Sequence, residues 1–269
     1  MSNIKFGFIG TGNMGGALAR AVALAVGGEN VIVADKSVKT AQLLANELKC
    51  SCGESKQIAA TAKYIFLGVK PQMLPDLLES LKPVFENRQD RFILVTMAAG
   101  VKLSFFNKIF GREYPIIRIM PNTPVSKGKG MIQYCENDAV FMDEISEFCE
   151  ALKRAGRVDR LDEKLIDAAS AVSGCGPAFA YLFAEALADA GVECGLPRNK
   201  ALEYASQMLS GAAELLLTSG KHPGVLKDEV CSPGGTTIAG VHALEDAGFR
   251  GAVMSAVKAA YDRTKELAK

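Results

Sequence analysis

Hydrophobic positions follow two different patterns along this chain, one in each half. In the first half, short continuous apolar runs alternate with stretches in which apolar residues recur every three or four positions. Runs of this length are typical of buried strands, and the three-to-four spacing is typical of amphipathic helices. Strands are expected at residues 5–9, 31–34, 64–69, 92–96 and 116–119, and helices at 14–26 and 40–48. Strands that alternate with helices predict βαβ units and a parallel-rich sheet.

The second half, from about Asp162, lacks the strand pattern and has the pattern of Ala-rich helices. Turn signals at 195–197 and 219–224 separate the helical segments. Helices are expected at 165–172, 178–190, 199–218 and 237–246, with a last one from Arg250. We therefore expect an α/β N-terminal domain over residues 1–160 and an all-α C-terminal domain over residues 161–269.

A glycine-rich turn, Gly10-Thr11-Gly12-Asn13-Met14-Gly15, joins the first expected strand to the first expected helix. Here Gly10 would permit the tight turn, Gly12 would leave room for a pyrophosphate, and Gly15 would let the helix pack closely on the strand. The helix N-terminus would offer N–H groups and a partial positive charge to the phosphates. A purely structural glycine turn is the alternative, but the strand–turn–helix context favours a Rossmann-like, dinucleotide-binding domain.

Residues at the end of the second expected strand give opposite indications about the dinucleotide. Asp35 lies about 20 residues after Gly15, where a carboxylate would bind the ribose 2′-OH of NADH. Lys36 and Ser37 follow it, and a cation with a hydroxyl would hold the 2′-phosphate of NADPH. We expect NADPH, with NADH as the alternative.

A second turn, Ser232-Pro233-Gly234-Gly235-Thr236-Thr237, precedes an apolar helical run. Thr236 or Thr237 is expected as the N-cap or as a first-turn residue. The two glycines would leave backbone N–H groups open, so the helix start could bind a small carboxylate that Thr237 also contacts. From these residues alone, a helix cap without a ligand explains the pattern equally well.

Three further segments lie at the ends of expected strands, at residues 68–72, 97–100 and 118–124. Ligands of open α/β sheets bind outside the carboxyl ends of the strands, so we expect these segments at the ligand-binding edge. Asn122 and Thr123 could donate hydrogen bonds there. For Arg118, an ion pair with a carboxylate is the favoured role.

Composition narrows the chemistry. The chain has 31 Lys+Arg and 30 Asp+Glu, which argues against nucleic-acid binding through bulk positive charge. With two histidines a three-His metal site is impossible, and the seven scattered cysteines are expected to be reduced thiols rather than metal ligands. Residues 1–5 show no signal-peptide pattern, and the most apolar stretch, 178–188, is too short to span a membrane. We therefore expect a cytoplasmic protein without a metal.

Taken together, the motifs resemble those of the pyrroline-5-carboxylate reductase family, and the resemblance runs essentially end to end. The block at 232–237 is its most specific part. The other matching segments are residues 10–15, 69–71, 98–100, 118–124, 173–178, 189–191, 195–198, 222–224 and 226–228. The chain departs from many members at Ser55 and Cys175, and from some at Glu229.

This resemblance implies a Rossmann-like domain followed by a helical domain that forms an intertwined homodimer, which assembles into decamers in some members. It also implies reduction of the cyclic imine 1-pyrroline-5-carboxylate to L-proline with NAD(P)H, the final step of proline synthesis. A protonated imine is already a good electrophile, so alignment of the nicotinamide with the imine carbon would suffice without a metal or a histidine.

Site residues also follow from the resemblance. Thr237 would be catalytic, near the ring nitrogen, and Glu163 would lie near the substrate pocket. The substrate carboxylate would be held by Ser232, Gly234, Gly235, Thr236 and Thr237. The cofactor would be held by Gly10, Thr11, Gly12, Asn13, Met14, Gly15, Asp35, Lys36, Ser37, Ser55, Val69, Lys70, Pro71, Ala98, Ala99 and Asn122.

Two alternatives remain. A β-hydroxyacid dehydrogenase would share the domain plan but would carry a catalytic lysine in a stretch that corresponds to residues 176–181, where this chain has none. A dinucleotide-binding regulator without catalysis would not need the intact turn at 232–237.

Overall fold

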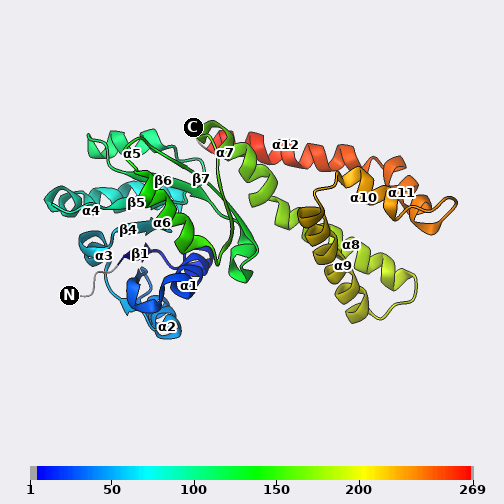
Figure 1. The fold of residues 1–269 in the computed structure, drawn as a ribbon, viewed down its shortest axis with the longest axis horizontal. Coiled ribbons are helices and arrows are strands. Elements are labelled where there is room, and N and C mark those ends of the chain that lie inside the picture. Colours follow the sequence, from blue (N-terminus) through cyan, green and yellow to red (C-terminus); the bar gives the residue numbers. More distant parts are fainter. Residues whose placement is uncertain (1–4, 268–269) are drawn as a thin grey trace. The chain divides into compact units, whose positions relative to one another are not determined.

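The computed structural model describes residues 5–267, which form two compact units (Figure 1). Residues 1–4, which carry most of the expectation about a signal peptide, lie outside the described residues. The first unit extends to Gly174 and also includes the described residues from Tyr261 to Leu267, and the second is Cys175–Ala260. The first unit continues past the expected boundary at residue 160 because helix α7 (Glu163–Ala169) packs against the sheet.

The first unit contains an eight-stranded sheet in the order β3-β2-β1-β4-β5-β6-β7-β8. Neighbouring strands are parallel except β6 and β7, which confirms the expected parallel-rich sheet. The strand order reverses between β1 and β4, where ligands bind in open α/β sheets. The strands are β1 (Phe6–Ile9), β2 (Val31–Ala34), β3 (Ser51–Cys52), β4 (Tyr64–Leu67), β5 (Ile93–Thr96), β6 (Ile116–Met120), β7 (Gly130–Glu136) and β8 (Gly156–Arg160).

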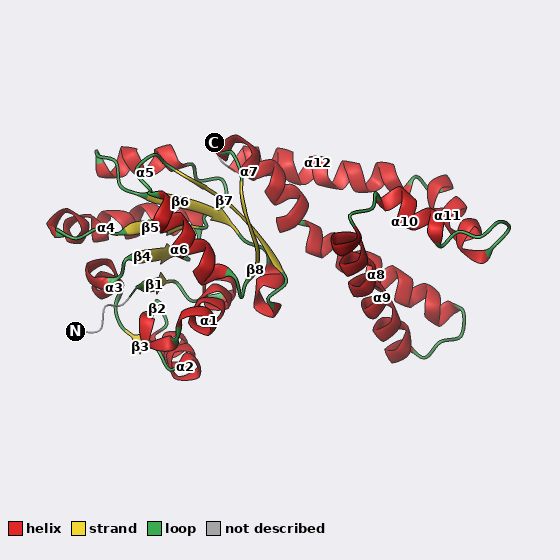
Figure 2. Ribbon diagram, viewed as in Figure 1, coloured by secondary structure: helices red, strands yellow, loops and turns green. Residues whose placement is uncertain are grey.

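Helices cover both faces of this sheet (Figure 2). In β2, Val31 and Val33 pack into one hydrophobic cluster, whereas Ile32 and Ala34 pack into the other. This alternation follows from the two-residue period of a strand that is buried on both faces. One cluster includes α1 (Asn13–Val26), α2 (Val38–Leu48) and α6 (Met142–Leu152), and the other includes α3 (Ser55–Thr61), α4 (Leu74–Asn87) and α5 (Leu103–Phe110).

All five expected strands and both expected helices of the first half are present, with ends that differ by at most two residues. Strands β3, β7 and β8 and helices α3 to α6 were not expected. Shorter helical turns complete the unit: η1 (Gly28–Asn30), η2 (Pro71–Met73), η3 (Thr123–Lys127) and the π-turn η4 (Ser170–Gly174).

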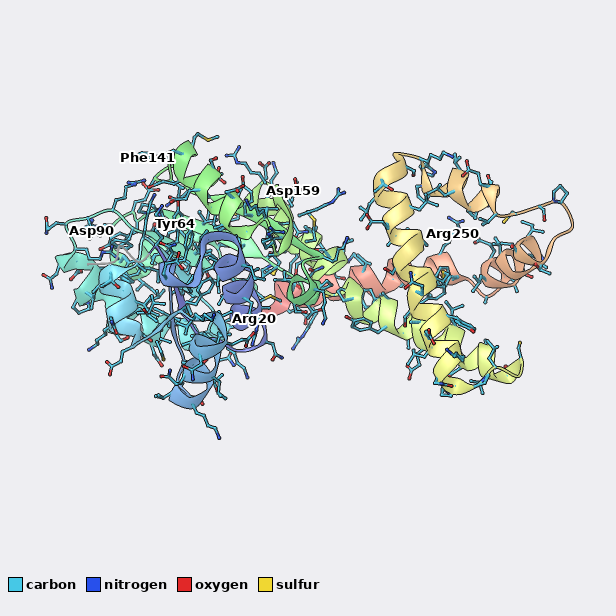
Figure 3. All side chains as sticks on the ribbon, turned by 60° about the horizontal axis from the view of Figure 1, so that its bottom comes forward. Arg20, Tyr64, Asp90, Phe141, Asp159 and Arg250 are labelled. Atoms are coloured by element: carbon cyan, nitrogen blue, oxygen red, sulfur yellow. The ribbon has the colours of Figure 1, made fainter. Side chains whose placement is uncertain are left out.

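The second unit is built from helices alone, as expected. They are α8 (Gly176–Glu193), α9 (Arg198–Ser219), α10 (Pro223–Glu229), α11 (Thr236–Asp246) and α12 (Phe249–Leu267), whose last residues belong to the first unit. Helix α10 begins within a segment that we expected to be a turn. Helices α8 and α9 pack against each other through small side chains, Ala184 and Ala188 on one and Ala201 and Ala205 on the other. Figure 3 shows the side chains, with Tyr64 in the α/β unit and Arg250 in the helical unit.

Helical structure continues from α7 through η4 into α8, so one helix runs over Glu163–Glu193. By length and composition this helix could cross a membrane, which corrects the expectation that the longest apolar stretch is too short. A single such helix is weak evidence for a span, because apolar helices of soluble proteins pass the same test.

Candidate active site

The conformation of the glycine-rich turn and the space around it agree with the role expected for each of its glycines. Gly10 has a φ of +93°, which a residue with a side chain rarely adopts. A Cβ on Gly15 would lie 2.0 Å from the carbonyl oxygen of Gly10, so the helix packs on the turn only with glycine there. A Cβ on Gly12 would meet no atom within 4 Å, which leaves open space beside the turn.

Helix α1 begins at this turn with its N–H groups available. Gly12 is the N-cap, and no side chain of the described residues caps the helix. The first turn carries no acidic residue. The first N–H groups of a helix have no partner within it, and together with the helix dipole they attract an anion. The start of α1 is therefore suited to a pyrophosphate.

Asp35 is tied to the glycine-rich turn. Its Oδ2 accepts hydrogen bonds from the backbone N–H and the hydroxyl of Thr11, at 2.7 and 3.1 Å. Its Oδ1 accepts from the N–H of Ser37 at 2.9 Å, and the Ser37 hydroxyl oxygen accepts from the N–H of Thr40 as the cap of α2. Lys36 is exposed and has no hydrogen bond or ion pair to the part of the chain described here. The sequence did not indicate that Asp35 holds the glycine-rich turn through hydrogen bonds.

A cavity of about 380 Å³ lies beside these residues. It brings together five of the expected cofactor residues and five others. The expected ones are Gly10, Asp35, Lys36, Ser55 and Val69, and the others are Ile9, Gln72, Met73, Asp76 and Leu77. Met73, Asp76 and Leu77 were missed because they are on η2 and α4, and α4 was not expected.

Register places the three loop segments along one edge of the sheet. Ile9 of β1 pairs with Leu67 of β4, Leu67 with Thr96 of β5, and Thr96 with Arg118 of β6. The segments 68–72, 97–100 and 118–124 therefore leave the sheet at its carboxyl edge, as expected. There Ala98 is buried, and Lys70 is exposed.

Arg118 forms the buried ion pair that the sequence favoured. It is 1% exposed, with Nη2 2.6 Å from Oδ1 of Asp167 and Nη1 3.4 Å from Oε1 of Glu163. Oε1 of Glu163 also accepts the backbone N–H of Leu103, the first residue of α5, at 2.7 Å. Glu163 thus links α7 to β6 and to the start of α5. Its expected place near the substrate pocket stays a prediction.

Asn122 connects β7 to the π-turn η4. Its side-chain N–H donates to the carbonyl oxygen of Ser173 at 2.9 Å, and its side-chain oxygen accepts from the N–H of Met131 at 2.9 Å. Gln133 also donates to the Ser173 hydroxyl at 2.8 Å. With these contacts Asn122 holds the segment that leads into α8, and its expected contact with the cofactor stays a prediction.

In the helical unit, the turn at 232–237 opens α11. Gly235, rather than Thr236 or Thr237, is the N-cap, so the two threonines occupy the first turn. The N–H of Gly235 donates to the carbonyl oxygen of Ser232 at 3.0 Å. Both threonine hydroxyls are exposed and lack hydrogen bonds to described residues, and the first turn has no acidic residue. This helix start resembles that of α1 and is suited to a small anion.

Cysteines and metal ligands add no further chemistry within the described residues. The seven cysteines are all free, and burial raises the pKa of the Cys135 thiol to about 12. Among residues 5–267, no group of three or more His, Cys, Asp or Glu side chains is arranged to hold a metal ion.

Comparison with known proteins assigns both halves of the chain. Residues 163–267 match the family described as pyrroline-5-carboxylate reductase dimerisation, and residues 5–100 match NADP oxidoreductase, coenzyme F420-dependent. The pyrroline-5-carboxylate reductase of Pisum sativum is 38% identical over 263 residues, which cover 97% of this chain and 95% of the relative. That of Synechocystis sp. is 40% identical, with 99% of both chains covered.

Solved structures agree. The NADP-bound pyrroline carboxylate reductase of Plasmodium falciparum is similar with a TM-score of 0.87 and 34% identity, over the whole of both chains. The enzyme of Coxiella burnetii is similar with a TM-score of 0.91 and 29% identity, over 99% of both chains. Similarity at this identity over the full length establishes that the chain belongs to the pyrroline-5-carboxylate reductase family, the oxidoreductases that reduce pyrroline-5-carboxylate in proline biosynthesis.

Proposed function

We propose that the chain reduces 1-pyrroline-5-carboxylate to L-proline with NADPH as the hydride donor. The observation that carries the proposal is the pair of glycine-rich turns, each of which opens a helix without a side-chain cap from the described residues and without an acidic first turn. One helix start suits the pyrophosphate of a dinucleotide, and the other suits a carboxylate. The two reactants, NADPH and the carboxylate-bearing imine, each carry one of these anionic groups.

In this mechanism the protein binds the substrate and aligns its imine carbon for hydride transfer. The backbone N–H groups at the start of α11 hold the substrate carboxylate, and the Thr237 hydroxyl contacts the ring nitrogen. The hydride adds to the imine carbon, the carbon–nitrogen double bond becomes single, and the protonated nitrogen keeps its proton. No general acid is required, because the protonated imine is already electrophilic, and the rate depends on orientation. Val69, Ala98 and Ala99 would line the path to the nicotinamide.

Two features support NADPH over NADH. The Asp35 carboxylate already accepts three hydrogen bonds from Thr11 and Ser37, which leaves it less capacity for a ribose 2′-OH. Lys36 and Ser55 line the same cavity, and neither has a hydrogen-bond or ion-pair partner in the described part of the chain. A cation and a hydroxyl are suited to a 2′-phosphate.

We further propose that the enzyme works in the cytoplasm as a homodimer, or as a decamer built from such dimers. Seven free cysteines fit a reducing compartment. The match of residues 163–267 to a dimerisation family supports self-association. The balanced charge supports neither nucleic acid nor an anionic membrane as a partner.

Loss of nicotinamide absorbance with pyrroline-5-carboxylate tests this proposal, with NADPH and NADH in parallel. Rapid turnover that favours NADPH in kcat/KM is the expected result. Folded protein that binds NADPH but does not turn over the imine would refute the proposal and favour the regulator. Preference for NADH would refute the cofactor assignment alone.

A further inference from the structure

One side of the cofactor cavity is lined by residues to which the proposed function gives no role. They are Gln72, Met73, Asp76 and Leu77, from η2 and the first turn of α4. Any inference about them rests on the proposed dinucleotide site. The part of the dinucleotide that would lie against them depends on where each group binds.

The order of elements along the cavity indicates which group of the dinucleotide would lie near these residues. The pyrophosphate is expected at the start of α1, and the adjoining ribose is expected at the end of β2, beside Asp35 and Lys36. In a dinucleotide the base is joined to this ribose on the side away from the pyrophosphate, so it would lie toward the part of the cavity lined by α3 and α4. Apolar side chains there, Met73 and Leu77, are suited to the faces of a flat base, and polar groups beside them would contact its edge.

Asp76 is the carboxylate of the cavity whose acceptors are unused. The cavity has two carboxylates, and that of Asp35 accepts three hydrogen bonds. The exposed carboxylate of Asp76 makes no hydrogen bond or ion pair with any residue in 5–267. An acidic residue in a first turn also favours its own helix through the dipole, but the dipole does not require a position on the cavity wall.

An ionised carboxylate only accepts hydrogen bonds. The exocyclic amine of adenine donates, whereas the corresponding carbonyl oxygen of hypoxanthine can only accept. We propose that Asp76 is a specificity-determining residue that accepts a hydrogen bond from the adenine amine of the cofactor and selects against bases with an oxygen at that position.

The test compares NADPH with its hypoxanthine analogue as cofactors for pyrroline-5-carboxylate reduction. Wild-type enzyme is expected to favour NADPH about tenfold in kcat/KM, mostly through KM. The hypoxanthine analogue loses the hydrogen bond to the Asp76 carboxylate and places its carbonyl oxygen against a carboxylate oxygen. Asp76→Ala should bring this ratio near one. Asp76→Asn, whose amide can donate or accept, should do the same. Glu79→Ala, an exposed residue on α4 outside the cavity, should keep the wild-type ratio.

Equal use of the two cofactors by wild type, or an unchanged ratio in Asp76→Ala, would overturn the proposal. The ratio of equilibrium dissociation constants for NADP⁺ and its hypoxanthine analogue gives the same comparison without turnover. If no imine is reduced, the proposed function fails, while these binding ratios still decide the role of Asp76.

Discussion

At the scale of single residues, the buried side chain of Arg118 constrains the α/β unit. A buried guanidinium is stable only with carboxylates beside it, and Asp167 and Glu163 provide them. Asp167→Asn would leave the buried charge with one partner at 3.4 Å. We expect the free energy of unfolding to fall by about 2 kcal/mol, measured by urea denaturation. Glu150→Ala, which removes an exposed ion pair with Lys153, should cost less than about 0.5 kcal/mol. Equal effects of the two substitutions would contradict this account.

Lys36 carries the proposed cofactor preference. Lys36→Ala removes the cation expected at the 2′-phosphate, so we expect KM for NADPH to rise about tenfold while KM for NADH stays within twofold. Steady-state kinetics with both cofactors measure the effect. Lys39→Ala is the matched control, because Lys39 is exposed on α2 and does not line the cavity. An equal rise in KM for NADH would show that Lys36 does not bind the 2′-phosphate.

Residue roles that depend on local geometry could be predicted from the sequence, whereas the partners in contacts between distant residues could not. The functions of Gly10 and Gly15 follow from the strand–turn–helix order, and the structure has the expected geometry. The hydrogen bonds of Asp35 and Asn122 join residues that are far apart in the sequence, so no spacing pattern indicated them.

At the scale of elements, two of the three missed strands, β3 and β8, differ from the predicted ones in position and composition. Strands β1, β2, β4, β5 and β6 are buried along their whole length and therefore appear as apolar runs. Strand β8 is an edge strand with sequence GRVDR, and β3 at the other edge has two residues. Edge strands require no continuous apolar run, so hydrophobic patterning does not detect them.

Helix α6 is anchored by the carboxylate of Glu147, which makes its docking sensitive to pH. Burial alone would raise the pKa of Glu147, but hydrogen bonds from Lys63, Lys5 and Tyr64 lower it below its usual range. Tyr64 is labelled in Figure 3. A lowered folded-state pKa gives stability that is present above the unfolded-state pKa and is lost as the pH falls through the folded-state value.

We therefore expect the free energy of unfolding to decrease as the pH falls below about 4.3, the usual value for glutamate. Glu147→Gln should be less stable than wild type at pH 7 and should lose less stability on acidification. Urea denaturation at several pH values between 7 and 3 measures both quantities. A pH dependence as steep as that of wild type would exclude Glu147 as a source.

The role proposed for the start of α11 can be tested at Thr237. Thr237→Ala removes an exposed hydroxyl without a partner among the described residues, so the free energy of unfolding should change by less than about 0.5 kcal/mol. We expect kcat/KM for the imine to fall at least about tenfold. Thr218→Ala, whose hydroxyl bonds only to its own helix, is the control. A fully active Thr237→Ala would remove Thr237 from the mechanism.

At the scale of the whole molecule, the two units differ in how they bury apolar surface. The α/β unit has large hydrophobic clusters on both faces of its sheet. In the helical unit, the buried side chains of α8 and α9 are alanines, and many large apolar residues are exposed. Burying so little apolar surface does not offset the entropy of ordering the chain. The Ala-rich sequence pattern did not predict this difference in buried apolar surface, because it predicts helices but not what packs against them.

A second copy of the chain is the partner that the dimerisation family indicates for this surface. Leu182 is 67% exposed and lines a cavity of about 870 Å³ between α8 and α9. Leu182→Glu would place a charge in that apolar surface, so we expect dimers to dissociate and activity to fall with them. Leu24→Glu changes a leucine that is exposed to a similar extent, 74%, on α1 of the other unit and should leave the assembly intact. Sedimentation velocity at micromolar concentration distinguishes the two variants. A monomeric wild type would contradict the prediction, because the apolar surface of the helical unit would then be stable in water without a partner.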